Sequence, residues 1–155
     1  MNVLDMIRKE FNVDPNRTYL MGHSMGGHGA LVCALRNPSR YKSVSAFAPI
    51  VAPTQGPWGR KAFSNYLGTD AATWCEYDAS ELVARKPFAA PILIDQGTAD
   101  QFLTEQLLPE KFAAAAAKTG QRLTLRMQPG YDHGYYFIQT FMADHLRHHA
   151  AILKK

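Results

Sequence analysis

The chain of 155 residues is long enough for one domain with a sizeable core, and its 46% hydrophobic and 19% charged residues exclude a disordered protein. The formal net charge of +4 is spread along the chain, and lysine and arginine form no run longer than pairs such as Arg60-Lys61 and Lys154-Lys155. We therefore expect no nucleic-acid partner. A solvated surface explains the mild positive balance better than attraction of an anionic substrate does.

The sequence shows no pattern typical of export or membrane insertion. The first eleven residues carry Asp5 and Glu10 and no long apolar run, so they do not resemble a secretory signal. No stretch is apolar enough to cross a membrane. The cysteines, Cys33 and Cys75, do not suggest a disulfide framework, and Cys33 is expected to be a buried thiol in an apolar helix. We therefore expect a cytoplasmic protein with no membrane partner.

The first part of the chain predicts helices and strands in alternation. Asn2 is expected to cap a first helix, and a turn at 14–16 then leads into a strand. The next helix is expected to stop at Asn37-Pro38, and a short apolar strand follows it. The apolar face of the first helix carries Val3, Leu4, Ile7 and Phe11, the strands are expected at 17–21 and 43–48, and the second helix at 25–35.

The second part of the chain begins with a segment rich in proline and small residues, 49–57, which predicts a loop. Three short helices follow, and then a nearly continuous apolar strand of the kind that is covered on both faces. A helix closed by Gly120, a fourth strand and a long amphipathic helix complete the chain. The expected ranges are 61–67, 72–76 and 80–85 for the short helices, 91–95 and 123–127 for the strands, and 104–118 and 135–153 for the long helices.

This order of elements predicts an α/β fold with a mostly parallel sheet of four strands and helices on both faces. In such sheets a functional site lies at the carboxyl ends of the strands. Chemically useful side chains should therefore follow the predicted strands directly.

The segment Gly22-His23-Ser24-Met25-Gly26 lies between the first strand and the second helix and fits the pattern G-x-S-x-G. In this pattern a serine sits on a strained turn that exposes its hydroxyl as a nucleophile. Gly22 and Gly26 are expected because a side chain there would collide with the neighbouring strand or block the turn. The pattern alone is weak evidence, because any glycine-rich strand-to-helix turn can match it.

Two further residues strengthen the interpretation. Asp100 follows the third strand and His133 follows the fourth, so the chain order is serine, acid, histidine, as in α/β-hydrolases. His133 would take the proton from Ser24 Oγ, since a neutral hydroxyl is a poor nucleophile. Asp100 would hold the imidazole in the correct tautomer and stabilise the imidazolium.

Other carboxylates and histidines are weaker candidates. Asp95 ends the third strand and is expected to be structural, and Asp132 is too close in sequence to His133 to orient it. His23 is expected to point away from the attack direction of Ser24, and His28 to pack or hydrogen-bond within the fold.

The last helix carries three histidines at a spacing that could hold a metal ion: His145, His148 and His149. No partner carboxylate or thiolate is evident nearby, so we expect a solvated helix end favoured by the helix dipole and no metal.

Longer segments resemble one family. GHSMGGHGAL, PWGRKAFSNYLGTD, ILIDQGTADQFL and GYDHGYYFIQTFMADHLRHHA are similar to the S-formylglutathione hydrolase (esterase D) family, and the resemblance runs from about Gly22 to His149. It implies an α/β-hydrolase fold and hydrolysis of the thioester S-formylglutathione to formate and glutathione, in formaldehyde detoxification and without a cofactor.

The resemblance also implies roles for particular residues. The triad falls on Ser24, Asp100 and His133, and the backbone N–H of Met25 is one oxyanion donor. Trp58 is expected near the acyl pocket, although a packed tryptophan would fit the sequence almost equally well.

In this family further strands precede the elbow and carry the loop with the second oxyanion N–H. We therefore expect residues 1–155 to be a partial domain, about the C-terminal half, from a truncated gene, a split protein or a partial chain. The strand at 17–21 would then be an unpaired apolar edge that favours self-association or binding of a separate N-terminal half.

Two classes of function stay open at this point. One is an active serine hydrolase, self-sufficient or complemented by another chain, with a small thioester or ester as substrate. The other is an inactive remnant that acts only as an interaction module. Within the enzyme class, a general carboxylesterase is the alternative to the thioesterase.

Overall fold

The computed structural model describes residues 3–154, and its centre is a parallel sheet of four strands. Each strand pairs with the next one along the chain, and all three pairings are parallel. The strands, in spatial and chain order, are β1 (Tyr19–His23), β2 (Ser43–Phe47), β3 (Ile92–Gly97) and β4 (Leu123–Gln128). The predicted parallel α/β sheet is confirmed. Asn2, the expected cap of the first helix, lies outside the described residues.

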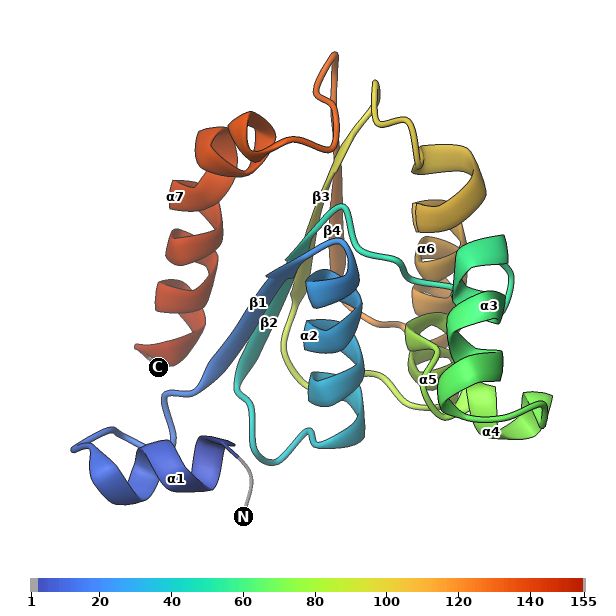
Figure 1. Ribbon diagram of the computed structural model, residues 1–155. Helices are drawn as coiled ribbons and strands as arrows, with labels where there is room; N and C mark the ends of the chain where they lie inside the picture. The colour runs from blue at the N-terminus through green and yellow to red at the C-terminus, as the bar shows by residue number, and fades with distance from the viewer. Residues whose placement is uncertain (1–2, 155) are drawn as a thin grey trace.

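Helices cover both faces of the sheet, as the alternation predicted (Figure 1). Helix α7 (Tyr135–Leu153) packs against β2 and β3 from one side. On the other side α2 (Met25–Arg36) packs against β1 and β2, and α6 (Pro109–Thr119) packs against β4. Between them α5 (Ala79–Arg85) packs against both α2 and α6. The short helices α3 (Pro57–Tyr66) and α4 (Ala71–Cys75) lie outside this layer.

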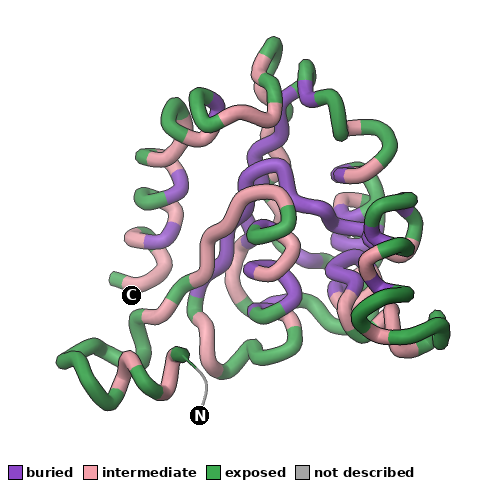
Figure 2. Tube along the Cα trace, viewed as in Figure 1, coloured by how far each residue is buried: buried purple, intermediate pink, exposed green. Residues whose placement is uncertain are grey.

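The two middle strands form the core, because every residue of β2 and β3 is buried (Figure 2). On the side of α2 and α5 they pack against Leu31 and Val83. On the side of α7 a smaller cluster joins Phe47 to Phe137, with the two rings edge to face. This burial on both faces explains the nearly continuous apolar sequence of β3.

Strand β1 lies at an edge of the sheet, and within residues 3–154 it pairs only with β2. None of its residues is fully buried, in contrast to β2 and β3. Helix α1 (Val3–Glu10) precedes it and buries no residue, although its predicted apolar face is present. Arg8 links this helix to the segment before β1 by donating to the Pro15 carbonyl and the Thr18 hydroxyl.

The single helix predicted at 104–118 is wrong, because the structure has two helical segments there. A π-helical turn, η1 (Leu103–Leu107), is followed by Leu108 in the left-handed conformation (φ 52°, ψ 46°), and α6 begins at Pro109. Proline has no N–H to donate and disfavours the helical conformation in the residue before it. Pro109 therefore ends one segment and begins the next.

The expectation of a buried Cys33 is also wrong, since this thiol is exposed on α2. The buried residues of this helix include Ala30, Leu31 and Ala34. Each residue turns the helix by about 100°, so Cys33 lies on the face away from the sheet. No helix within the described part of the chain is both long and apolar enough to cross a membrane.

Candidate active site

Ser24 occupies a strained turn between β1 and α2, with φ 57° and ψ −117°. A residue other than glycine rarely adopts a positive φ, and this conformation persists only where the surrounding structure holds it. Here Ser24 N–H donates to the Phe47 carbonyl (2.9 Å), while the Ser24 carbonyl accepts from His28 N–H (2.9 Å) and Ile50 N–H (3.3 Å). Ser24 is thus fixed at the carboxyl end of β1, as the G-x-S-x-G pattern predicted.

The glycines of this turn differ in their steric roles. A Cβ on Gly22 would lie 2.1 Å from the Gly26 carbonyl oxygen, so only glycine fits there. A Cβ on Gly26 would meet no described atom within 4 Å, so the steric reason expected at Gly26 is wrong for this part of the chain. The tighter second position is Gly27, where a Cβ would lie 3.0 Å from Pro49 Cβ. The close approach of α2 to the loop after β2 therefore depends on Gly27.

His133 and Asp100 are brought together at the carboxyl ends of β4 and β3. His133 Nδ1 lies 2.6 Å from Asp100 Oδ2, and the carboxylate is fully buried. Asp100 also accepts from Phe102 N–H (2.8 Å) and from the Gln96 amide (3.1 Å). Because a carboxylate can only accept, the proton of the imidazole lies on Nδ1 and Nε2 keeps its lone pair. This is the tautomer of a general base.

Two rings hold the imidazole of His133 in place. His23 lies against it with ring centroids 4.5 Å apart, and Phe102 meets it edge to face at 5.0 Å. Burial, and then repulsion from His133, lowers the pKa of His23, which favours a neutral ring beside the base. This contact was not predicted, because the expected direction of His23 concerned Ser24 alone. Its position in the elbow, next to the nucleophile candidate, was the available clue.

A cavity of about 280 Å³ lies beside Ser24. Trp58 lines it, and so does Phe102, which contacts His133. Met25 also lines this cavity. It is the first residue of α2, so its N–H has no acceptor within the helix. The full lining is Ser24, Met25, Ile50, Trp58, Phe102, Gln106 and Leu107.

Asp95 makes structural contacts, as expected, and does not bond to His133. It is fully buried on β3, forms a two-pronged ion pair with Arg126, and accepts from His145 Nε2 at 3.0 Å. Burial raises the pKa of Asp95, but the hydrogen bonds from His145 and Arg126 outweigh it and leave the pKa below its ordinary value. His28 is also structural, since its Nε2 donates to the Tyr77 carbonyl at 2.7 Å.

The expectation of a solvated helix end at the histidines of α7 is wrong for two of the three. His145 is fully buried and His149 is 2% exposed, because α7 turns this face toward β2. His149 bonds to the hydroxyls of Ser43 (2.7 Å) and Ser45 (2.8 Å), and burial lowers its pKa to about 3. Serines two apart on a strand share a face, and histidines four apart share a side of a helix. That pairing was the missed clue.

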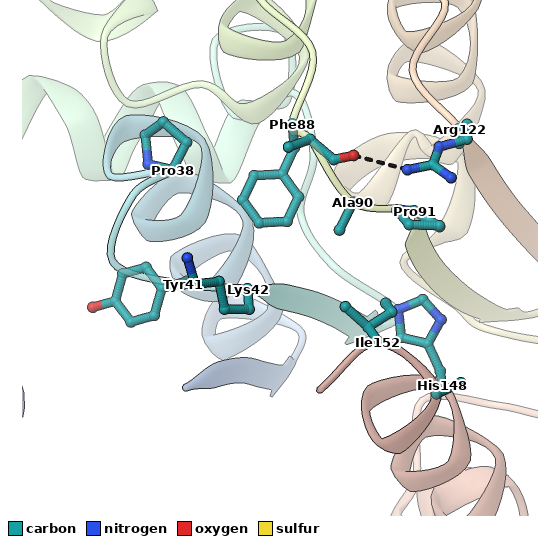
Figure 3. Close-up of a pocket in the computed structure, with 11 residues that line it drawn as sticks. Pro38, Tyr41, Lys42, Phe88, Ala90, Pro91, Arg122, His148 and Ile152 are labelled. Atoms are coloured by element: carbon teal, nitrogen blue, oxygen red, sulfur yellow. Dashed lines mark hydrogen bonds between the residues drawn. The ribbon is translucent and has the colours of Figure 1, made fainter. Parts of the chain in front are cut away.

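A larger cavity, of about 490 Å³, lies at the opposite, amino end of the strands (Figure 3). Phe88, Lys42 and His148 line it, together with Arg122, which donates to the Ala89 carbonyl at 2.8 Å. None of Ser24, Asp100 and His133 contributes to it. Its size therefore does not make it the candidate site.

Comparisons with known proteins identify the family of the chain. A family model described as "Putative esterase" matches residues 1–148. The chain belongs to this esterase family. It is 55% identical over 152 residues to an S-formylglutathione hydrolase of Bos taurus, and 56% identical over 150 residues to that of Mus musculus. Each alignment covers 96% of this chain and 53% of the relative.

A solved structure of an S-formylglutathione hydrolase from Agrobacterium tumefaciens superposes with a TM-score of 0.92 at 52% identity, over 96% of this chain and 54% of that one. The α/β-hydrolase type of fold is thereby confirmed. The chain spans about half the length of the curated relatives it matches.

Proposed function

We propose that this chain carries the catalytic residues of a serine hydrolase that cleaves S-formylglutathione to formate and glutathione, a reaction of formaldehyde detoxification. The observation that carries the proposal is the buried Asp100 carboxylate 2.6 Å from His133 Nδ1, at the same end of the sheet as the strained Ser24. The names of the relatives support the choice of substrate.

Each residue has one role in the proposed reaction. His133 Nε2 takes the proton of Ser24 Oγ as this oxygen attacks the thioester carbonyl, and Asp100 stabilises the imidazolium that forms. The Met25 N–H donates to the oxyanion of the tetrahedral intermediate. When the intermediate collapses, the C–S bond breaks, the thiolate receives the proton from His133, and a formyl ester remains on Ser24. Water, activated by His133, then hydrolyses this ester and releases formate. No step of this sequence uses a cofactor or a metal.

We further propose that residues 1–155 are a partial α/β-hydrolase domain that a separate N-terminal half completes. The edge strand β1, paired only with β2 within residues 3–154, offers the place where another strand would add. The relatives extend over about twice the matched length, which supports the same view. A second oxyanion donor from that half would contribute about 2.7–4 kcal/mol of transition-state stabilisation. Self-association of two copies through β1 is the alternative assembly. The proposed location is a reducing cytoplasm.

A general carboxylesterase is the second candidate, and the cavity beside Ser24 favours it. Its volume of about 280 Å³ exceeds what a formyl group needs, so larger acyl groups would also fit.

A mixing experiment tests the proposal. The chain is assayed with a formyl thioester, alone and with a purified first half of a related esterase, and its size is followed by chromatography. We expect activity to rise on mixing, together with a 1:1 complex, and to vanish in the Ser24→Ala variant. Full activity of a well-behaved monomer would contradict the need for a second half. Activity that survives in Ser24→Ala would contradict the mechanism.

A further inference from the structure

The π-helical turn η1 brings an additional polar side chain to the cavity beside Ser24. Within this turn Leu107 N–H donates to the Phe102 carbonyl and Leu108 N–H to the Leu103 carbonyl, five residues back in each case. Such turns are rare and frequently occur at functional sites. Here the turn carries Gln106 and Leu107, both of which line the cavity with Ser24.

The orientation of the Gln106 amide follows from chemistry. Its Oε1 lies 3.1 Å from the backbone nitrogen of Trp58. A backbone N–H can only donate, so the oxygen must face Trp58 and the NH₂ group is the free end. Within residues 3–154 that NH₂ group makes no hydrogen bond, and the only bond of the Gln106 side chain is the one from Trp58. The side chain thus keeps two donors for another partner.

Gly56 allows this arrangement. A Cβ at Gly56 would lie 3.2 Å from the Glu105 carbonyl oxygen and 3.4 Å from Gln106 Oε1. The first distance is tighter than nine in ten real Cβ contacts, so the neighbouring backbone would have to shift slightly. The absence of a side chain at Gly56 therefore lets η1 lie close to the start of α3. Glycine is commonly required where two backbone segments approach this closely.

The rest of the cavity is largely apolar. Met25, Ile50, Phe102 and Leu107 supply apolar walls, and the polar groups of the lining side chains are the Ser24 hydroxyl, the Gln106 amide and the indole N–H of Trp58. If Ser24 is the nucleophile, as proposed above, an acyl group bound to it shares this cavity with the NH₂ group of Gln106. A donor of this kind favours a ligand with a matching acceptor over a ligand of the same shape without one.

We infer that Gln106 is a specificity-determining residue, whose NH₂ group binds an acceptor atom in the acyl chain of the substrate. The preferred acyl groups are short chains with an ether or carbonyl oxygen a few atoms beyond the scissile carbonyl. The inference rests on the second candidate of the proposed function, the general carboxylesterase, because a formyl group has no chain that could carry such an acceptor. It takes the cavity beside Ser24 as the acyl site.

Methoxyacetyl and butyryl esters of p-nitrophenol provide the test, because the two acyl groups have the same shape and differ by one oxygen in place of CH₂. After division by their rates with hydroxide, the methoxyacetyl ester should have a kcat/KM about three- to tenfold higher, the range expected for one partly exposed hydrogen bond. The difference should lie in KM, since the bond exists before and during the reaction.

The Gln106→Glu variant isolates the donor. Glutamate has nearly the same shape and keeps an oxygen to accept from Trp58 N–H, but it loses the NH₂ group. The corrected preference should disappear or reverse in Gln106→Glu and disappear in Gln106→Met. Gln139→Glu makes the same charge change on an exposed part of α7 and should leave the preference unchanged. A preference that is unchanged in Gln106→Glu would overturn the inference.

A binding measurement separates this inference from the proposed function. In the Ser24→Ala variant, the side-chain amide resonances of Gln106 are followed by NMR as methyl methoxyacetate or methyl butyrate is added. We expect a saturable shift with the methoxy ester and a much smaller one with the butyrate. Equal shifts, or none, would overturn the role of Gln106. Absence of turnover in the unsubstituted chain, even after mixing with the first half of a related esterase, would count against the proposed function alone. The NMR result would still decide the inference.

Discussion

The molecule contains two histidine–aspartate pairs in different surroundings. At the carboxyl ends of the strands, His133 bonds to Asp100 at 2.6 Å. Under α7, His145 bonds to Asp95 at 3.0 Å, and its other ring nitrogen bonds to the Ser45 hydroxyl at 2.8 Å. The second set therefore joins a serine, a histidine and an aspartate by hydrogen bonds, which are the residue types of a hydrolase triad.

Access for a substrate, and the number of hydrogen bonds that the polar atoms already make, distinguish the two sets. Ser45, His145 and Asp95 are fully buried, and no substrate can reach them. The Ser45 hydroxyl also bonds to His149, and the Asp95 oxygens bond to Arg126 and Gln128 as well. The hydrogen bonds of His145 and His149 dock α7 on β2 and β3, and the Asp95 carboxylate also bonds to side chains of β4.

Ser24, in contrast, lines an open cavity and makes no side-chain cap to its own helix. His133 Nε2 has no partner within residues 3–154. The comparison shows that residue types in a chain of hydrogen bonds do not define a catalytic site. A catalytic site also needs groups that are left unpaired and accessible.

The largest expected effect is on covalent chemistry at the two serines. A fluorophosphonate should label Ser24, and Ser24→Ala should abolish labelling and lower any turnover by about 10³-fold or more. Ser45→Ala should leave labelling intact but lower the free energy of unfolding by about 1–3 kcal/mol, because His145 and His149 each lose a buried partner. Mass spectrometry and urea unfolding measure the two effects. Labelling that is lost in Ser45→Ala and kept in Ser24→Ala would contradict the assignment of Ser24 as the nucleophile.

The second test exchanges each aspartate for asparagine. Asp100→Asn should lower turnover by about 10⁴-fold with little change in stability, since the amide favours the wrong tautomer of His133. Asp95→Asn should leave chemistry largely intact but destabilise the fold by roughly 2–4 kcal/mol, because Arg126 loses its buried counter-charge. Assays of esterase activity and thermal unfolding on both variants provide the measurement. Loss of activity in a stable Asp95→Asn variant would contradict the assignment.

The sequence predicted the parallel sheet and the position of Ser24, Asp100 and His133 because these depend on local patterns. Apolar runs mark buried strands, and catalytic residues follow strand ends directly. The π-helical turn at Leu103–Leu107 escaped prediction because helix periodicity does not register one additional residue in a turn.

The buried histidines escaped prediction for a different reason. Whether His145 and His149 are buried depends on hydroxyl groups about 100 residues away, on β2. The sequence of one segment alone indicates only weakly that its polar groups will pair with groups of a distant segment. The contact of His23 with His133 is likewise formed only when the ends of β1 and β4 converge.

The third test concerns the backbone at the two serines. Ser24 lies on a strained turn that makes it accessible, and Ser45 lies within the regular strand β2. Gly22→Ala should disrupt this turn, since its Cβ would lie 2.1 Å from a backbone oxygen that cannot move without shifting α2. We expect a destabilisation of about 1–3 kcal/mol and loss of Ser24 labelling. Gly26→Ala places its Cβ in open space and should keep both properties within experimental error. Equal effects of the two variants would show that the strained turn does not control access.

The last expected effect is a pH dependence of stability to which His149 of the buried set contributes. Burial, followed by repulsion from His148 and His145, lowers the pKa of His149 to about 3 in the folded chain, against about 6.5 in the unfolded chain. Besides these two histidines, the groups that face His149 are Ser43, Ser45 and the ring of Tyr19. Below pH 6.5 the unfolded chain binds a proton here that the folded chain does not bind.

The contribution of the neutral His149 to stability is therefore fully present above about pH 6.5 and is lost as the pH falls toward about 3. The loss per pH unit in that window should approach about 1.4 kcal/mol. His149→Gln keeps groups that can bond to Ser43 and Ser45 but does not titrate, so its unfolding free energy should fall less steeply between pH 6 and 4. His148→Gln, at a half-buried position of the same helix, should flatten the profile less. Urea unfolding at several pH values measures the slopes, and identical slopes for the unsubstituted chain and His149→Gln would show that the buried set does not set the acid sensitivity of the fold.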